Sequence, residues 1–180
     1  MRALKIMLFL TALVSFVSCS KEENDPELET EMLLGEWHLE EFNYSGTNVY
    51  SAGNETASVS YTGEAVEIDF ETVFLKDGTY ITVGTYTIIL TSTAEGETAV
   101  EEFTYSDINT TGTYSIEDNK ITTTHEQEYP GQEMIAEISE GVIKELTPNR
   151  LILTYEYSGT TEVWGMEVEV NTNVIQIFSR

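Results

Sequence analysis

The 180-residue chain is poor in the side chains that most often carry catalysis or bind metal ions. It contains one cysteine, Cys19, and two histidines, His38 and His125. A lone cysteine forms no disulfide within the chain and no cysteine cluster for zinc, and neither H-x-x-H nor H-E-x-x-H is present. The G-x-S-x-G elbow of serine hydrolases and the G-x-x-x-x-G-K-[ST] phosphate loop are missing as well. These absences predict no cofactor, no metal centre and no enzymatic activity, with His38 an ordinary surface or partly buried side chain.

Positive charge is also scarce, because 8 Lys and Arg residues stand against 32 Asp and Glu residues, giving a formal net charge of −24. Such a surface repels nucleic acid and anionic lipid head groups. Solubility explains most of this charge. Calcium binding stays open as an alternative, although no D-x-[DN]-x-[DN]-G loop is present. With 32 acids, a carboxylate pair spaced for glycoside hydrolysis would arise by chance and identifies no enzyme.

The chain has one long apolar run, residues 6–17, which follows Arg2 and Lys5. Its 12 residues are too few for a membrane-spanning helix, which needs about 20. The charged start, the short apolar core and the small residues of Ser18-Cys19-Ser20 are typical of a cleaved signal peptide. We therefore assign residues 1–18 to a signal peptide, residues 19–31 to an acidic tether with the start of a short helix, and residues 32–180 to one folded domain.

The short helix is expected between Asp25 and Gly35. Asp25 suits its N-cap and Pro26 its first helical position. Leu28 and Met32 lie four residues apart on one face, and Gly35 is placed to end the helix. The segment is too short to stand alone, so we expect it to close one end of the domain.

After Gly35 the pattern favours β-strands. Apolar and acidic residues alternate over residues 66–71, which is typical of a half-buried strand, and Lys76-Asp77-Gly78 predicts a tight hairpin turn. Polar turns are also expected at Thr91–Thr98, centred on Glu95-Gly96, and at Asn171–Asn173. Eight to ten short antiparallel strands of this kind require a sandwich or a barrel, and strand count alone does not choose between them.

Phe16-Val17-Ser18-Cys19 resembles the lipobox of bacterial lipoproteins, with Phe16 where that family more often has Leu. The resemblance implies a diacylglycerol thioether and an acylated amine on Cys19, carrying fatty acids such as palmitate that together anchor the protein stably. The following cluster, residues 21–25, resembles the export signal that sends some Bacteroidetes lipoproteins to the cell surface, and an ordinary solvated linker explains it equally well. An outer membrane lipoprotein facing the periplasm or the cell surface is therefore implied.

A second resemblance concerns the folded domain. Gly35-Glu36-Trp37, after a short helix, looks like the entry to a lipocalin-type barrel, and further segments resemble the lipocalin-like domains of Bacteroidetes lipoproteins. The resemblance implies an all-β, antiparallel up-and-down barrel with a central cavity. It also implies that Trp37 packs under an arginine from late in the chain, for which Arg150 and Arg180 are both candidates. The Thr-Asp-Tyr loop motif of lipocalin transporters is missing, which favours the wider lipocalin-like set. The further segments are Asp77-Gly78-Thr79-Tyr80, Gly112-Thr113-Tyr114-Ser115-Ile116, Asn119-Lys120-Ile121 and residues 143–153.

Aromatic residues are abundant in the expected strands, with 10 Tyr, 7 Phe and 2 Trp in the chain. Most should fill the core, but tyrosine couples an apolar ring to a hydroxyl that needs a partner, and an eight-stranded barrel is either filled or holds one small ligand. We therefore predict a binding protein for a small hydrophobic or amphipathic ligand. The alternatives are a structural or protein-binding envelope protein with a filled core, and a glycan-binding surface. The predicted ligand-binding residues are Tyr80, Tyr86, Tyr114, Tyr155, Tyr157, Trp164 and Met166.

Overall fold

The computed structural model describes residues 30–53, 55–127, 135–163 and 165–180. The predicted signal peptide, Cys19, the first part of the predicted helix and Trp164 lie outside these residues. What is described of the helix is a single 3-10 turn, η1 (Thr30–Leu33), followed by Gly35 at a positive φ of 109°. Among the described residues, no helix is long and apolar enough to cross a membrane. The strands are β1 (Gly35–Ala52), β2 (Glu55–Phe74), β3 (Thr79–Ala94), β4 (Glu97–Glu117), β5 (Lys120–Gln127), β6 (Ile135–Thr147), β7 (Arg150–Val163) and β8 (Met166–Ser179).

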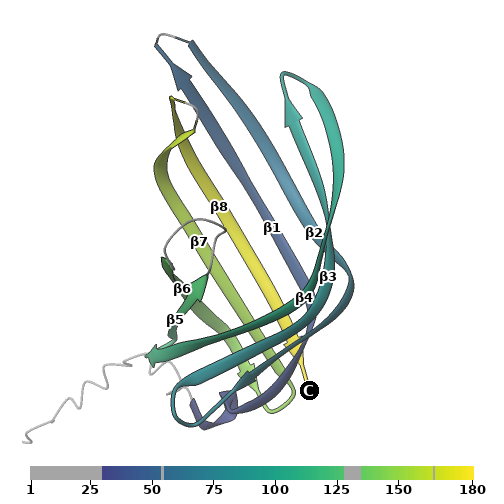
Figure 1. The fold of residues 1–180 in the computed structure, drawn as a ribbon, viewed down its shortest axis with the longest axis vertical. Helices are drawn as coiled ribbons and strands as arrows, with labels where there is room; N and C mark the ends of the chain where they lie inside the picture. The colour runs from purple at the N-terminus through teal and green to yellow at the C-terminus, as the bar shows by residue number, and fades with distance from the viewer. Residues whose placement is uncertain (1–29, 54, 128–134, 164) are drawn as a thin grey trace, which may run out of the picture.

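Each strand pairs antiparallel with the next, and β8 pairs with β1, so the sheet closes into a barrel. This confirms the predicted all-β, up-and-down barrel. Figure 1 shows η1 and the C-terminus at one end, which we call the closed end. The hairpins β1–β2, β3–β4 and β7–β8 extend toward the opposite end, which we call the open end (Figure 1).

The wall of the barrel is complete only near the closed end. β5 pairs with β4 over Gly112–Glu117, and β6 pairs with β7 over Gly141–Thr147. Within the described part of the chain, the remainder of β4 therefore pairs only with β3, and the far half of β7 pairs only with β8. Figure 1 shows the short β5–β6 hairpin beside the lower part of the longer strands. The inner face of the sheet is thus less enclosed toward the open end.

The hydrophobic core fills the barrel at the closed end. Trp37, Leu33 and Leu151 are completely buried there, and side chains from all parts of the ring surround them. Eight-stranded barrels are narrow enough for such side chains to fill the interior. The lower lumen is therefore packed protein, and space for a ligand must lie nearer the open end. The buried cluster comprises Leu33, Trp37, Leu39, Phe74, Tyr80, Ile121, Ile143, Leu151, Leu153 and Phe178.

Of two predicted polar turns, the structure confirms the centre of one, Glu95-Gly96, but shortens it, and it contradicts the other. Only Glu95 and Gly96 turn between β3 and β4, and both have positive φ (53° and 86°), as a two-residue type I′ turn requires. The turn predicted at Asn171–Asn173 is wrong, because these residues lie inside β8, where Asn171 pairs with Thr47 of β1. A polar residue is tolerated in this strand because Asn171 Oδ1 accepts a hydrogen bond from Ser158 Oγ at 2.7 Å.

The strands are also fewer and longer than the pattern suggested, since bulges bend them where breaks were expected. Glu67, Gly84 and Asp107 have positive φ values of 50°, 135° and 55°. The β2–β3 register shifts between Val66 and Asp69, and the β3–β4 register shifts between Gly84 and Tyr86. A bulge inserts an extra residue and increases the local twist without ending the strand. The barrel therefore has eight long, bent strands, which is the lower end of the predicted range of eight to ten.

Candidate functional site

Trp37 and Arg180 close the lower end of the barrel. The indole Nε1 of Trp37 donates a hydrogen bond to the carbonyl oxygen of Leu33 at 2.8 Å. The guanidinium carbon of Arg180 lies 3.9 Å from the centroid of the Trp37 ring, which is a cation–π contact. Arg180 also donates hydrogen bonds to the backbone carbonyl oxygens of Met32 (2.9 Å), Leu33 (3.4 Å), Leu34 and Glu36 (3.3 Å).

These contacts hold η1 against the barrel. The last carbonyl groups of a helical turn have no partner inside it, and a cation beside them is favourable. Of the two arginines that the sequence left open, Arg180 is therefore the one that packs on Trp37. Arg150 instead lies on the surface, with its Nε 3.6 Å from Glu145 Oε2.

On the inner face, tyrosines lie directly across from glycines of the neighbouring strand. Tyr44 of β1 pairs with Gly63 of β2, and Tyr61 of β2 pairs with Gly46 of β1. A Cβ atom added to either glycine would overlap the facing tyrosine, so the rings lie flat along the wall. Tyr80 and Tyr155 repeat the arrangement over Gly112 and Gly141, where an added Cβ would come within 2.6 Å of the ring.

Aromatic rings form a connected series from the core toward the open end, which we call the ring chain. It consists of Phe42, Tyr44, Tyr61, Phe70, Tyr86 and Tyr105. Phe42 and Phe70 pack against the buried core, whereas Tyr105 is 48% exposed. Ring centroids are 6.1 Å apart for Tyr61 and Tyr44, 5.9 Å for Tyr44 and Phe42, 5.6 Å for Tyr86 with either Phe42 or Phe70, and 5.2 Å for Tyr86 and Tyr105.

A hollow of about 290 Å³ lies beside the ring chain. The register places its lining on the inner face, because Asn48 pairs with Val59, and Leu90 pairs with Gly63 opposite Tyr44. Asn48 Oδ1 is buried and has no hydrogen-bond partner among the described residues. A buried acceptor without a donor costs about 1–3 kcal/mol. The lining residues are Tyr44, Asn48, Val59, Tyr61, Leu90 and Ser92.

Two tyrosines of the ring chain, Tyr44 and Tyr86, hold their hydroxyl protons more tightly than usual. Burial raises the pKa of Tyr44 and of Tyr86, and the neighbouring Tyr105 raises both further. The Tyr61 hydroxyl reaches across β1 to Thr172 Oγ1 at 2.5 Å. The site therefore offers neutral rings and hydroxyl groups, which suits recognition of an uncharged amphipathic surface.

A larger hollow, about 650 Å³, is lined by residues of β6, β7, β8, β1, β2 and β3. Most of its lining residues alternate with inward-facing ones such as Tyr44 and Tyr155, which places their side chains on the outside. We call it the outer groove. Its outward-facing lining is mainly polar and consists of Asn43, Ser45, Thr62, Glu64, Ile89, Thr91, Lys144, Thr154, Glu156, Asn173 and Ile175.

The structure places the residues predicted to bind a ligand in different parts of the barrel. Tyr80 is part of the buried core and Tyr155 packs against it, and Tyr86 belongs to the ring chain. Tyr114 packs against the same core, with its ring centroid 5.1 Å from that of Phe74, and its hydroxyl donates to the carbonyl oxygen of Leu75 at 2.8 Å. Tyr157 is 56% exposed, Met166 begins β8, and Trp164 is outside the described residues.

Sequence reasoning missed Tyr44, Asn48 and Tyr61. A signal for two of them is present, because Tyr-x-Gly occurs at Tyr44–Gly46 and again at Tyr61–Gly63. In an antiparallel pair of the observed register, each tyrosine meets the glycine of the other motif. Asn48 has no comparable signal, because its burial depends on residues from other strands.

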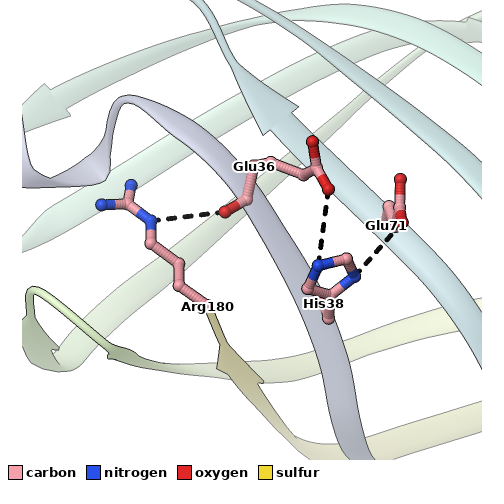
Figure 2. Close-up of polar contacts among 4 residues, drawn as sticks. All are labelled: Glu36, His38, Glu71 and Arg180. Atoms are coloured by element: carbon pink, nitrogen blue, oxygen red, sulfur yellow. Dashed lines mark hydrogen bonds and ion pairs between the residues drawn. The ribbon is translucent and has the colours of Figure 1, made fainter.

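His38 lies on the opposite face of β1 from Trp37, as expected from alternation. Figure 2 shows its ring between the carboxylates of Glu36 and Glu71, on the outside of the barrel. The ring nitrogens lie 3.4 Å from Glu36 Oε1 and 3.2 Å from Glu71 Oε1. These side chains are the group among the described residues that could together offer ligands to a metal ion.

An eight-stranded up-and-down barrel, closed by a tryptophan under an arginine, defines a lipocalin-like fold. The family described as "Lipocalin-like domain" matches residues 33–153, which are 153 − 32 = 121 of the 180 residues. The chain therefore belongs to the lipocalin-like domain family, whose fold is that of a ligand-binding barrel. Comparison with curated proteins gives no match. Comparison with solved structures gives none either.

Proposed function

We propose that this domain is a non-enzymatic binding protein that holds one small amphipathic molecule on its inner face, above the packed core. The buried, unpartnered Asn48 Oδ1 in the inner hollow carries the proposal. When the side chains around the hollow shift to admit it, a ligand with an N–H or O–H group would supply the missing donor, while its apolar body would cover the rings of Tyr44 and Tyr61. The expected ligand is therefore uncharged, compact and partly aromatic or aliphatic, with at least one hydrogen-bond donor.

Replacing Asn48 separates this proposal from a general attraction for lipophiles. A panel of phenols, indoles, sterols and fatty acids is screened by thermal shift, and any hit is titrated by calorimetry. Asn48→Leu should weaken a donor-bearing hit about tenfold, since one hydrogen bond to a buried acceptor is lost. The unliganded variant should melt no lower than the parent, because the unpaired acceptor is gone as well.

Asn173→Leu is the matched control, because Asn173 lines the outer groove instead. It should leave the affinity for the same compound unchanged. A panel without any hit, or a hit that Asn48→Leu binds as tightly as the parent does, contradicts the inner site.

The outer groove favours a second candidate, a glycan or another hydrophilic ligand. Its outward amide, hydroxyl and carboxylate groups match the hydrogen-bonding groups of a sugar, and it is larger than the inner hollow. A glycan array followed by titration of Asn173→Leu tests it. In this case Asn173→Leu should lose binding, and Asn48→Leu should keep it.

We also propose that the domain is anchored in the outer membrane through lipid on Cys19, after removal of residues 1–18. The lipobox-like Phe16-Val17-Ser18-Cys19 supports the anchor, and no other cysteine competes for the modification. Metabolic labelling with palmitate should mark the parent and leave Cys19→Ser unlabelled. Protease treatment of intact cells then distinguishes a surface-facing domain, which is degraded, from a periplasmic one, which is protected.

A further inference from the structure

Glu36, His38 and Glu71 meet on the outer face at the closed end, away from both hollows described above. Glu36 and His38 are two residues apart on β1, so they share a face, and Glu71 of β2 is the register partner of His38. One ligand atom from each side chain lies within 4.8 Å of the others. The imidazole therefore stands between two carboxylates from two strands (Figure 2).

Both ring nitrogens of His38 face a carboxylate oxygen, Nε2 at 3.4 Å and Nδ1 at 3.2 Å. A neutral imidazole has only one N–H group, so it can donate to one of these carboxylates while its other nitrogen presents a lone pair. The nitrogen without a hydrogen therefore faces a carboxylate oxygen, and these two electron-pair donors repel each other unless a cation lies between them. A metal ion on that lone pair would supply the cation, and the other carboxylate also offers an oxygen within 4.8 Å of the other ligand atoms.

Within the part of the chain that the structure describes, the ion-pair partner of both Glu36 and Glu71 is His38, not a lysine or an arginine. Arg180 is close by, but its hydrogen bonds go to backbone carbonyl oxygens, including that of Glu36, and its guanidinium group stacks on Trp37. The chain as a whole carries a formal charge of −24, which attracts cations to its surface. The side chains of Glu36, His38 and Glu71 are 57%, 50% and 38% exposed, so an ion can reach them.

We propose that Glu36, His38 and Glu71 bind one divalent transition-metal ion, with zinc as the best fit. An imidazole nitrogen with two carboxylate oxygens is a donor set that zinc accepts, and water would fill the fourth position. Calcium prefers six to eight oxygen ligands, so it fits this set poorly. The site is independent of the inner-face ligand, and it departs from the expectation that the sequence contains no metal centre.

The experiment uses the full chain with Cys19→Ser and without a histidine tag, so that no thiol or tag competes for metal. Zinc is titrated by calorimetry at neutral pH, and cobalt is titrated with its visible absorption as a second readout. We expect one ion per chain, and affinity reduced roughly tenfold or more in both His38→Ala and Glu71→Gln. His125→Ala is the matched control, since it removes the other histidine, and it should bind as the parent does.

The cobalt spectrum reports the ligands themselves, so a structural effect of a substitution does not imitate the result. Loss of the visible bands in His38→Ala, with circular dichroism unchanged, supports the site. Zinc binding that persists in His38→Ala and Glu71→Gln, no binding by the parent, or tighter binding of calcium than of zinc would overturn the proposal.

Discussion

Arg180 and Arg150 carry the same charge, but their surroundings predict very different contributions to stability. Arg180 donates to several backbone carbonyl groups and stacks on Trp37, whereas Arg150 makes one long contact with Glu145 on the surface. Hydrogen bonds from a charged group and a cation–π contact each contribute on the order of 1 kcal/mol or more. An exposed ion pair contributes about 0–1 kcal/mol.

Arg180→Met should therefore lower the free energy of unfolding by about 2 kcal/mol. Arg150→Met should lower it by less than about 1 kcal/mol. Urea denaturation followed by tryptophan fluorescence measures both, and the emission of the Arg180 variant should also shift as η1 loosens. Equal effects of the two substitutions would mean that Arg180 does not hold the closed end.

Tyr155 makes stability depend on pH in the alkaline range. Burial, with a smaller effect of Tyr80, raises its pKa to about 12, above the ordinary tyrosine value of about 10. Because the unfolded chain loses this proton first, the contribution is complete below about pH 10 and is lost as pH rises to about 12. The free energy of unfolding should fall by on the order of 2 kcal/mol across that range.

Tyr155→Phe is the test of this assignment. The ring that packs against the core is kept, but the ionisable hydroxyl is removed, so the alkaline loss of stability should be smaller than in the parent. Urea titrations at several pH values between 9 and about 12 measure the difference. An identical pH profile in both proteins would assign the loss to other groups.

On the inner face, β1 and β2 are held together by the reciprocal packing of Tyr44 on Gly63 and of Tyr61 on Gly46. The rings lie against the wall only because glycine has no Cβ at these positions. The same packing leaves space beside the rings for the inner hollow. The β1–β2 pair therefore forms part of the barrel wall and also provides a flat aromatic surface beside the inner hollow.

Gly63→Ala should push Tyr44 off the wall and cost about 1–3 kcal/mol, the usual penalty of overpacking. The double variant Gly63→Ala with Tyr44→Ala removes the clash, so its loss of stability should be smaller than the sum of the two single losses. A double-mutant cycle by urea denaturation gives the coupling. Additive losses would show that the ring does not lie on Gly63.

The strands themselves could be predicted from alternation and turn residues, but their lengths could not. Thr91–Thr98 and Asn171–Asn173 are polar, which favours turns when the sequence is considered alone. In the barrel all of these residues except Glu95 and Gly96, which form the β3–β4 turn, lie on strands, where polar side chains are accommodated. Bulges at Glu67 and Asp107 likewise depend on the neighbouring strand, so no local sequence pattern predicts them.

For the whole molecule, the closed barrel and the Trp37 closure followed from the resemblance in the sequence, and the choice between Arg150 and Arg180 did not. That choice depends on where the last strand ends relative to η1, which is a property of the complete register. The incomplete wall was not predictable either, because it results from the short stretches over which β5 pairs with β4 and β6 pairs with β7. The candidate ligand site, at Tyr44, Asn48 and Tyr61, therefore lies on the inner face above the packed core, which the sequence alone did not indicate.

The net charge of −24 predicts that salt stabilises the protein. Acidic groups that repel one another are brought closer on folding. The range of this repulsion, the Debye length, is about 30 Å at 0.01 M ionic strength but only about 3 Å at 1 M. Raising sodium chloride across this range should raise the melting temperature by several degrees, measured by scanning calorimetry.

Choline chloride should give the same shift, because screening does not depend on which monovalent cation is present. Calcium chloride at matched ionic strength should add nothing further. A larger shift with calcium would reveal specific carboxylate coordination, and a melting temperature independent of salt would show that the acids are too far apart to repel.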